Sequence, residues 1–225
     1  MRIQGRGQSI RRDNGIANKR PFIIGIGGSH SGAGKTTIAE AILKYLTSQS
    51  SESGVRSSKI KNRESLITCH SSLVTRRDWG AIKYTKTAIY ASIIDDPETL
   101  TQESKDTARL INAGAEKVLW VQSPPEELKE VLPMAVDRLA NLRGIIVEGN
   151  SAIEFLKPDI VIFVSGRHGG ALKKSAERVL ETADIILFED EPSMQLPEKA
   201  KRFKVVFTPM SGFDECLDYI QKLLK

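Results

Sequence analysis

A glycine-rich stretch followed by a lysine and two threonines can hold a phosphate group. The stretch reads Ser29-His30-Ser31-Gly32-Ala33-Gly34-Lys35-Thr36-Thr37. Glycines let the backbone curl so that successive N–H groups point at one phosphate, and the N-terminus of a following helix adds its positive dipole end. The lysine can reach the β- and γ-phosphates, and the threonine hydroxyl can ligate Mg²⁺. The stretch therefore predicts a site for a nucleoside triphosphate, ATP or GTP, with Mg²⁺ as cofactor.

The residues of this loop have separate expected roles. Lys35 is expected to act in catalysis, Thr36 to hold the metal, and Thr37 to contact the α-phosphate. His30 has no carboxylate partner that the sequence identifies, so a tolerated loop residue is a simpler interpretation than a catalytic one. Ser29 stands where the usual pattern has glycine, which costs little if its φ is negative. The expected nucleotide-binding residues are Gly32, Ala33, Gly34, Lys35, Thr36 and Thr37.

A loop of this kind works with a carboxylate from another buried strand, which holds the water shell of the metal. Glu148 follows an apolar run, whereas Asp159 precedes one. Functional groups in open α/β sheets gather at the carboxyl ends of strands. Glu148 is therefore predicted to position Mg²⁺ or water and to act in catalysis, with a structural carboxylate as the alternative. Glu189 and Asp190 also end a run, but their acidic neighbours indicate a solvated edge.

Two further charged residues could face a second ligand. Lys83 lies near the end of an apolar run and could supply a fixed positive charge to an anionic substrate or to a transferring phosphoryl group. The alternative is a lysine that extends into solvent. Asp106 could orient a nucleophile or cap the helix that it opens. The segment Asp95-Asp96-Pro97-Glu98 indicates a turn leading to that helix rather than a metal site.

Short apolar runs alternate with helical segments along most of the chain. Such runs are typical of parallel strands that are buried on both faces. The pattern predicts one three-layer α/β domain, an α-β-α sandwich with a mostly parallel sheet of about seven strands, as in P-loop NTPases. The expected strands lie at residues 22–26, 81–84, 118–121, 145–147, 160–164, 185–188 and 205–207.

Local signals add two expectations about helices and cysteines. The segment Ser123-Pro124-Pro125-Glu126 predicts a capping box that opens a helix running to about Leu139. Cys216 lies on an apolar stripe of the last helical segment, which predicts a core position. Two cysteines cannot form a disulfide framework, and no Cys/His cluster has zinc-ligand spacing.

The length and the distribution of charge predict one folded domain with extensions. The 225 residues, 40% of them apolar, allow one core. Residues 1–20 carry six bases and one acid and are predicted to form a mobile basic arm. Residues 21–225 are predicted to form the nucleotide-binding domain, with a Ser-rich basic insert at 48–78 in which nine of 31 residues are serine.

Charge and hydropathy also bear on partners and location. The net charge of +5 comes from the arm, because the other 205 residues hold 27 bases and 27 acids. Neither the arm nor the insert interleaves aromatic residues with its charges, which argues against a nucleic-acid partner. No apolar run approaches the roughly 18 residues that span a bilayer, and no secretory signal is evident. A cytoplasmic protein without a membrane partner is therefore expected.

Beyond the loop, three segments resemble the molybdopterin-guanine dinucleotide biosynthesis adaptor (MobB) family. Residues 144–149, Gly-Ile-Ile-Val-Glu-Gly, are similar to a Val-Glu-Gly segment that this family shares with dethiobiotin synthetase. Residues 80–85, Gly-Ala-Ile-Lys-Tyr-Thr, resemble the family's strand ending in Ile-Lys-His. Residues 105–109, followed by Ala-Gly-Ala at 113–115, resemble its Lys-Asp-Ser/Thr and Arg stretch. The resemblance covers about residues 22–165 without the insert.

The resemblance implies a nucleotide-binding domain of the signal-recognition/MinD/BioD class. Carried over by position, Lys35 and Thr36 would bind phosphate and metal, Glu148 would serve the Mg²⁺ site, and Lys83 and Asp106 would face a second ligand across the γ-phosphate. The adaptor family implies a slow NTPase, with GTP expected, that works with a cofactor-assembly protein in molybdenum or tungsten cofactor biosynthesis. Dethiobiotin synthetase implies an ATP-dependent kinase or ligase acting on a small acidic substrate. The sequence leaves the choice of nucleotide and the formation of a homodimer open.

Overall fold

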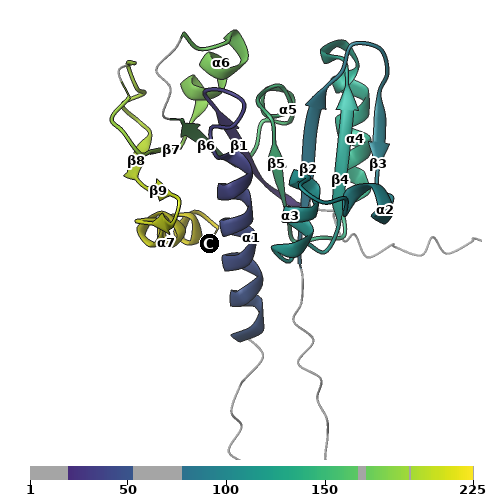
Figure 1. The fold of residues 1–225 in the computed structure, drawn as a ribbon, viewed down its shortest axis with the longest axis horizontal. Helices are drawn as coiled ribbons and strands as arrows, with labels where there is room; N and C mark the ends of the chain where they lie inside the picture. Colours follow the sequence, from purple (N-terminus) through teal and green to yellow (C-terminus); the bar gives the residue numbers. More distant parts are fainter. Residues whose placement is uncertain (1–19, 53–77, 167–170, 193, 225) are drawn as a thin grey trace, which may run out of the picture.

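In the part of the chain that the structure describes, eight strands form one sheet at the centre of the fold (Figure 1). The computed structural model describes residues 20–52, 78–166, 171–192 and 194–224, without the side chains of residues 49–52. The strands are β1 (Phe22–Gly28), β2 (Trp79–Lys86), β3 (Ser92–Ile94), β4 (Val118–Ser123), β5 (Gly144–Glu148), β6 (Ile160–Ser165), β7 (Ile185–Phe188) and β8 (Lys201–Lys204). Their order is β3-β4-β2-β5-β1-β6-β7-β8, and β3 pairs antiparallel to β4 while the other neighbours are parallel.

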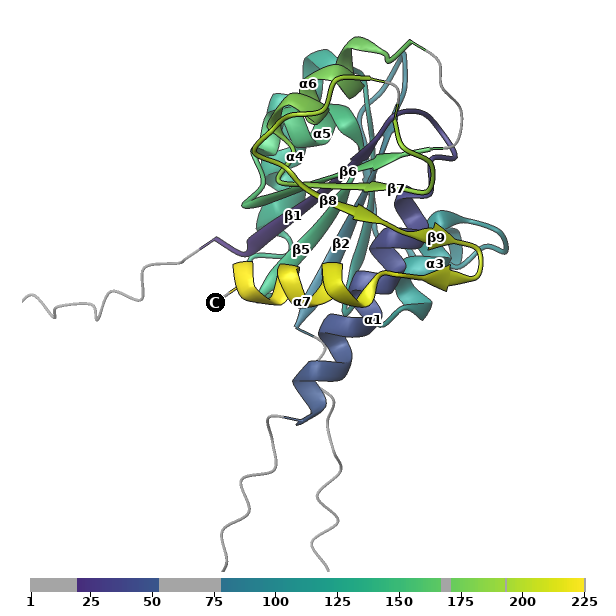
Figure 2. The same cartoon turned by 90° about the vertical axis from the view of Figure 1, so that its left-hand side faces the viewer.

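Helices cover both faces of this sheet (Figures 1 and 2). One face carries α1 (Lys35–Glu52), α3 (Asp106–Asn112) and α7 (Asp214–Leu223). The other carries α4 (Leu128–Asp137), α5 (Asn150–Leu156) and α6 (Lys174–Thr182). Short helical turns occur at α2 (Pro97–Leu100) and η1 (Pro125–Glu127). The three-layer α/β fold with a mostly parallel sheet, predicted from the sequence, is confirmed.

The central strands are apolar on both sides because both sides are covered. Successive residues of a strand point to opposite faces. Ile24 and Ile146 therefore lie in the core cluster under α1, while Ile23 and Ile145 lie in the cluster under α4. Burial of these side chains stabilises the fold by about 25 cal/mol per Å² of apolar surface. It thereby holds in place the central strands.

The edges of the sheet differ from the sequence prediction. The antiparallel strand β3 was not predicted, because three residues are too few to form a recognisable pattern. At the other edge, the expected strand at residues 205–207 is wrong in its position. The edge strand is β8, whose sequence Lys-Arg-Phe-Lys holds one apolar residue, and residues 206–207 belong to a separate hairpin of β9 (Val206–Phe207) and β10 (Met210–Ser211).

Two local predictions also need correction. The capping box at residues 123–126 is wrong: Ser123 ends β4, its hydroxyl donates to the carbonyl of Pro124, and a 3₁₀ turn precedes α4. The helix α1 continues to Glu52 and so includes the first five residues of the predicted Ser-rich insert at 48–78. Residues 53–77, like the predicted arm at 1–19, lie outside the described residues. Within the described ranges, no helix is both long and apolar enough to cross a membrane.

Cys216 provides a test of the packing of α7. Its side chain is 0% exposed, and burial raises the pKa of the thiol to about 12. Because the thiolate is the reactive form, we expect Cys216 in a Cys69→Ser variant not to react with an aromatic disulfide reagent at pH 8 while the protein is folded. Full reaction in urea is the control. Stoichiometric labelling of the folded variant within seconds would contradict this packing.

Candidate functional site

The phosphate loop connects β1 to α1 and has the backbone that its glycines allow. Gly32 has a φ of +82° and Gly34 a φ of +95°, conformations that residues with a side chain rarely adopt. Ser29 is not among the described residues with a positive φ, so the serine causes no backbone strain. The N–H of Ile38 donates to the carbonyl of Gly34 at 3.0 Å, which closes the first turn of α1 immediately after the loop.

Two neighbouring segments hold this loop in place. The side-chain amide of Asn150, at the start of α5, exchanges two hydrogen bonds with the backbone of Gly28, at 2.9 and 3.0 Å. The hydroxyl of Ser29 accepts the N–H of Gly166, beyond β6, at 3.0 Å. Neither contact was predicted, because each depends on how distant segments pack against the loop. The amide of Asn150, two residues after Glu148, is the sequence signal that could have indicated the first contact.

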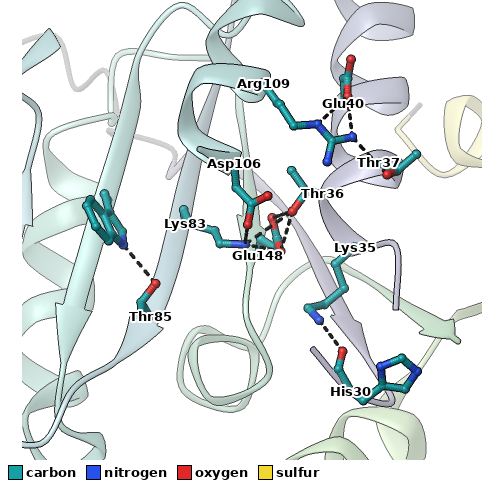
Figure 3. Close-up of polar contacts among 11 residues, drawn as sticks. His30, Lys35, Thr36, Thr37, Glu40, Lys83, Thr85, Asp106, Arg109 and Glu148 are labelled. Atoms are coloured by element: carbon teal, nitrogen blue, oxygen red, sulfur yellow. Dashed lines mark hydrogen bonds and ion pairs between the residues drawn. The ribbon is translucent and has the colours of Figure 1, made fainter. Parts of the chain in front are cut away.

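Four polar side chains from different elements meet beside the loop (Figure 3). The hydroxyl of Thr36 donates toward both carboxylate oxygens of Glu148, at 2.8 and 3.0 Å. The ammonium of Lys83 lies 2.5 Å from Oε1 of Glu148 and 2.6 Å from Oδ2 of Asp106. The structure therefore brings together Thr36, Lys83, Asp106 and Glu148, all of which the sequence singled out.

Each of the four side chains reaches this point because of its place in the fold. Thr36 is in the first turn of α1, Glu148 ends β5, and Lys83 lies opposite Glu148 in the register of β2 with β5. Asp106 is the first residue of α3. The interpretation of Asp106 as a cap is wrong, because Lys105 occupies the cap position and the Asp106 carboxylate binds Lys83. The Glu148 and Lys83 side chains are only 3% and 16% exposed, so neither extends into solvent.

Burial and neighbouring charges shift the protonation of two groups here. Burial lowers the pKa of Lys35 below its usual value; Glu148 opposes this shift, Lys83 adds to it, and Asp106 opposes it. Burial alone would raise the pKa of Asp106, but the hydrogen bond and charge of Lys83 outweigh this effect, and the pKa lies below its usual value. Lys35 points along the loop and donates to the carbonyl of His30 at 2.8 Å.

The oxygen atoms of Thr36 and Glu148 suit a small divalent cation. Mg²⁺ prefers oxygen ligands such as hydroxyl, carboxylate and water oxygens. The hydroxyl and carboxylate oxygens are separated by 2.8 and 3.0 Å. The donor set, a hydroxyl and a carboxylate that face one cavity, therefore fits Mg²⁺, which Thr36 would bind directly and Glu148 directly or through water.

Arg109 joins α3 to α1 next to this group. Its guanidinium donates to Oε2 of Glu40 at 2.9 and 3.2 Å and to the hydroxyl of Thr37 at 3.1 Å. Arg109 lies one turn after Asp106, so both side chains project from the same face of α3. No role was predicted for Arg109, although its spacing from Asp106 was the available signal.

The ion pair of Glu40 should be visible in the pH dependence of stability. Burial alone would raise the pKa of Glu40, but hydrogen bonds from Lys44 and Arg109 outweigh it, and the pKa lies below its usual 4.5. A carboxylate with a lowered pKa stabilises the fold at higher pH and loses this contribution as the pH falls through its folded pKa. We therefore expect Glu40→Gln to lower the free energy of unfolding by about 1 kcal/mol at pH 7.

The same substitution should cost less as the pH falls below 4.5 and through the lowered pKa of the folded state, because the wild-type carboxylate becomes protonated there. Urea unfolding at pH 7 and near pH 3 measures the difference. Exposed Glu116→Gln is the matched control and should change neither value. An equal decrease in the free energy of unfolding by Glu40→Gln at both pH values would contradict a stabilising ion pair at Glu40.

The loop and the four polar side chains line one cavity of about 630 Å³. Its wall is formed by the loop, the ends of β2 and β5, and the first residues of α3 and α5. Its ionic lining residues among those described are Lys35, Lys83, Lys86, Arg109 and Lys173 against Asp106 and Glu148. The cavity is therefore positively charged overall and suits a ligand with several negative charges.

The other carboxylates that were considered from the sequence lie outside this group of four side chains. Asp159 pairs with Arg20 and accepts the N–H of Ile23, at the amino ends of the strands and thus at the opposite edge from the loop. Asp96 caps α2 by accepting the N–H of Thr99, in agreement with a turn. The interpretation of Glu189 as a solvated residue is wrong, because it is 9% exposed and accepts the N–H of Phe207.

No family model and no curated protein matches this chain. Among solved structures it is similar to a LAO/AO transport system kinase, with 17% identity and a TM-score of 0.48 over 91% of this chain and 59% of that chain. It is also similar to the signal recognition particle 54 kDa protein from Aeropyrum pernix K1 in complex with GDP, with 14% identity and a TM-score of 0.42 over 92% of this chain and 46% of that chain.

A third similar structure is the signal recognition particle receptor FtsY from Elizabethkingia anophelis. It has 10% identity and a TM-score of 0.39, over 92% of this chain and 66% of that chain. This chain thus spans 46% to 66% of the lengths of these three proteins. Similarity this low carries no function from them to this chain.

Proposed function

We propose that this chain binds a nucleoside triphosphate with Mg²⁺ and cleaves its terminal phosphoryl bond. The observation that supports this proposal most strongly is the position of Thr36 and Glu148. Their oxygen atoms are in contact with each other and lie directly beside a glycine loop and Lys35, in a cavity with a surplus of positive charge. A structural glycine turn would not need this combination.

The residues of the loop would bind the phosphates. The backbone N–H groups from Gly32 to Thr37 would cradle them, and Lys35 would exchange the neutral carbonyl of His30 for charged phosphate oxygens, which are stronger acceptors. When bound, Mg²⁺ would neutralise charge on the transferring phosphoryl group. Thr36 and Glu148 would hold the Mg²⁺ ion.

Lys83 and Asp106 would act where the terminal phosphate meets its attacking group. Lys83 is fixed by Glu148 and Asp106, so its charge is positioned before any ligand binds. Asp106 is 43% exposed and lines the cavity, so its carboxylate can accept a hydrogen bond from a water or from the hydroxyl or amine of an acceptor. These two residues would therefore orient the nucleophile across the γ-phosphate.

The finer function rests on the sequence resemblance. We propose a slow NTPase similar to the MobB adaptors, acting with a cofactor-assembly protein in molybdenum or tungsten cofactor biosynthesis. The alternative is an ATP-dependent kinase or ligase similar to dethiobiotin synthetase. The observation that favours the alternative is that Lys83 lines the cavity, where it could hold a small acidic substrate.

Measurement of the products with ATP and GTP, in Mg²⁺ and in EDTA, tests these proposals. Slow Mg²⁺-dependent release of phosphate that only a partner protein stimulates is expected for the adaptor. A phosphorylated or ring-closed product formed in equal amount to the nucleoside diphosphate, from one small acid, would support the alternative and contradict the adaptor. The absence of both phosphate release and nucleotide binding would contradict the general proposal.

A further inference from the structure

The proposed phosphate site leaves open which residues meet the nucleoside. Glu148 and Lys83, at the proposed γ-phosphate end, lie on β5 and β2, on one side of β1. The strands β6, β7 and β8 lie on the other side of β1, and Figure 1 shows them across α1 from β5 and β2. Because a triphosphate is an extended chain, a nucleoside at its α-phosphate end would extend away from Glu148 and Lys83.

An aromatic side chain lies against the loop on that far side. Three ring atoms of Phe207, in β9, are 3.6–3.7 Å from the point where a Cβ on Gly34 would be. Gly34 has no side chain, so nothing separates the ring from the loop backbone. Phe207 is partly buried against the core under α1 and keeps part of its surface exposed. Figure 2 shows β9 beside the first turns of α1.

The fold holds this ring in a fixed position. The N–H of Phe207 donates to Oε1 of Glu189 at 2.9 Å, and Glu189 is buried directly after β7. The N–H of Val205, two residues before Phe207, donates to the carbonyl of Phe188 at 2.8 Å and ties the chain to the same strand end. Pairing of β9 with β10 fixes the other edge of the segment. A rigid aromatic ring beside a phosphate loop costs little entropy when a ligand stacks on it.

We propose that Phe207 is the stacking residue for the base of the bound nucleotide and that Glu189 is the positioning residue that holds it there. This inference rests on the proposed nucleotide-binding function and adds the nucleoside side of the site. Every base has a π-face, so stacking supports binding without selecting between ATP and GTP. The contribution should therefore be present for both nucleotides and absent for a ligand that has phosphates but no base.

Calorimetric titration with Mg²⁺ complexes of GTP, ATP and inorganic tripolyphosphate tests the proposal. Phe207→Leu keeps an apolar side chain in the core but removes the π-face. We expect it to weaken the affinity for both nucleotides about five- to a hundredfold and to leave the affinity for tripolyphosphate within about twofold. Val206→Ala, in the same strand and 40% exposed, is the matched control and should bind all three ligands as the wild type does.

A fluorescence measurement serves if the leucine variant does not fold. The indole of a Phe207→Trp variant should be quenched by GTP and ATP but not by tripolyphosphate, relative to the wild type with its two native tryptophans. We expect Glu189→Ala to lose nucleotide affinity. Glu189→Gln keeps the acceptor oxygen and should recover it. A merely structural role would affect tripolyphosphate equally.

The outcomes separate this inference from the proposed function. Lys35-dependent binding of tripolyphosphate and nucleotides, with Phe207→Leu equal to the wild type, would overturn the stacking role alone. An equal loss for all three ligands in Phe207→Leu would also overturn it, because it would show a structural effect on the loop. Binding of no ligand by the wild type would overturn both proposals.

Discussion

Glu148→Ala should lower the free energy of unfolding of the nucleotide-free protein by about 3 kcal/mol, the cost of removing one partner from a buried ion pair. Glu148 is 3% exposed and contacts both Thr36 and Lys83. Without it, the ammonium of Lys83, 16% exposed, keeps Asp106 as a partner that is itself 43% exposed. Urea unfolding without nucleotide measures this loss.

A second substitution tests whether the loss of stability comes from the charge of Lys83. Adding Lys83→Met to Glu148→Ala removes the lysine charge that has lost its buried partner, so the double variant should be more stable than the single one, and the two effects should not add. Asp190→Ala, an exposed carboxylate just beyond a strand end, is the matched control and should change little. Equal stability of Glu148→Ala and wild type would contradict the buried network.

The same substitution should also weaken the dependence on Mg²⁺. Loss of a carboxylate that orients a metal or its water shell typically costs about 10- to 100-fold in metal affinity or activity. We expect the Mg²⁺ concentration for half-maximal turnover to rise by this factor in Glu148→Ala. An unchanged Mg²⁺ dependence would assign Glu148 the purely structural role that the sequence left open.

Lys35→Ala should have the largest effect on ligand binding and a small effect on stability. A hydrogen bond to a charged group contributes about 1.5–3 kcal/mol, and Lys35 would reach two phosphates, so nucleotide affinity should fall at least about 100-fold. Burial lowers the pKa of Lys35, so keeping it protonated costs stability at pH values below the lowered pKa. Removing this charge should therefore not destabilise the fold.

These opposite expectations distinguish the two residues. Glu148→Ala should have a lower free energy of unfolding than the wild type. Lys35→Ala should have a free energy of unfolding within about 1 kcal/mol of the wild-type value and still lose nucleotide affinity. Lys129→Ala, an exposed lysine in α4, is the control for removing a lysine from a helix. Strong destabilisation by Lys35→Ala would mean that its loss of binding reflects unfolding.

How far the sequence predicts the site depends on how local each signal is. The phosphate loop is contiguous, so its residues could be identified without knowledge of the fold. Glu148 and Lys83 were found because parallel strands bring their carboxyl ends to one edge of a sheet, and the register of β2 with β5 places them opposite each other. The roles proposed for them remain predictions.

Contacts between distant segments could not be predicted in this way. Three contacts depend on helix docking and on the path of the chain after β8. They join Asn150 to Gly28, Arg109 to Glu40, and Glu189 to Phe207. The charged edge strand β8 also has no hydrophobic pattern by which to recognise it, because an edge strand is not buried on both sides. Such features require the packed structure.

The central claim is Mg²⁺-dependent binding of a nucleoside triphosphate at the Lys35 loop. Calorimetric titration of the wild type and Lys35→Ala with GTP and ATP, in Mg²⁺ and in EDTA, tests it most directly. We expect saturable one-to-one binding of at least one nucleotide by the wild type, weaker binding in EDTA, and at least about 100-fold weaker binding by Lys35→Ala. Equal binding by both proteins, or no binding of either nucleotide by the wild type, would contradict the account.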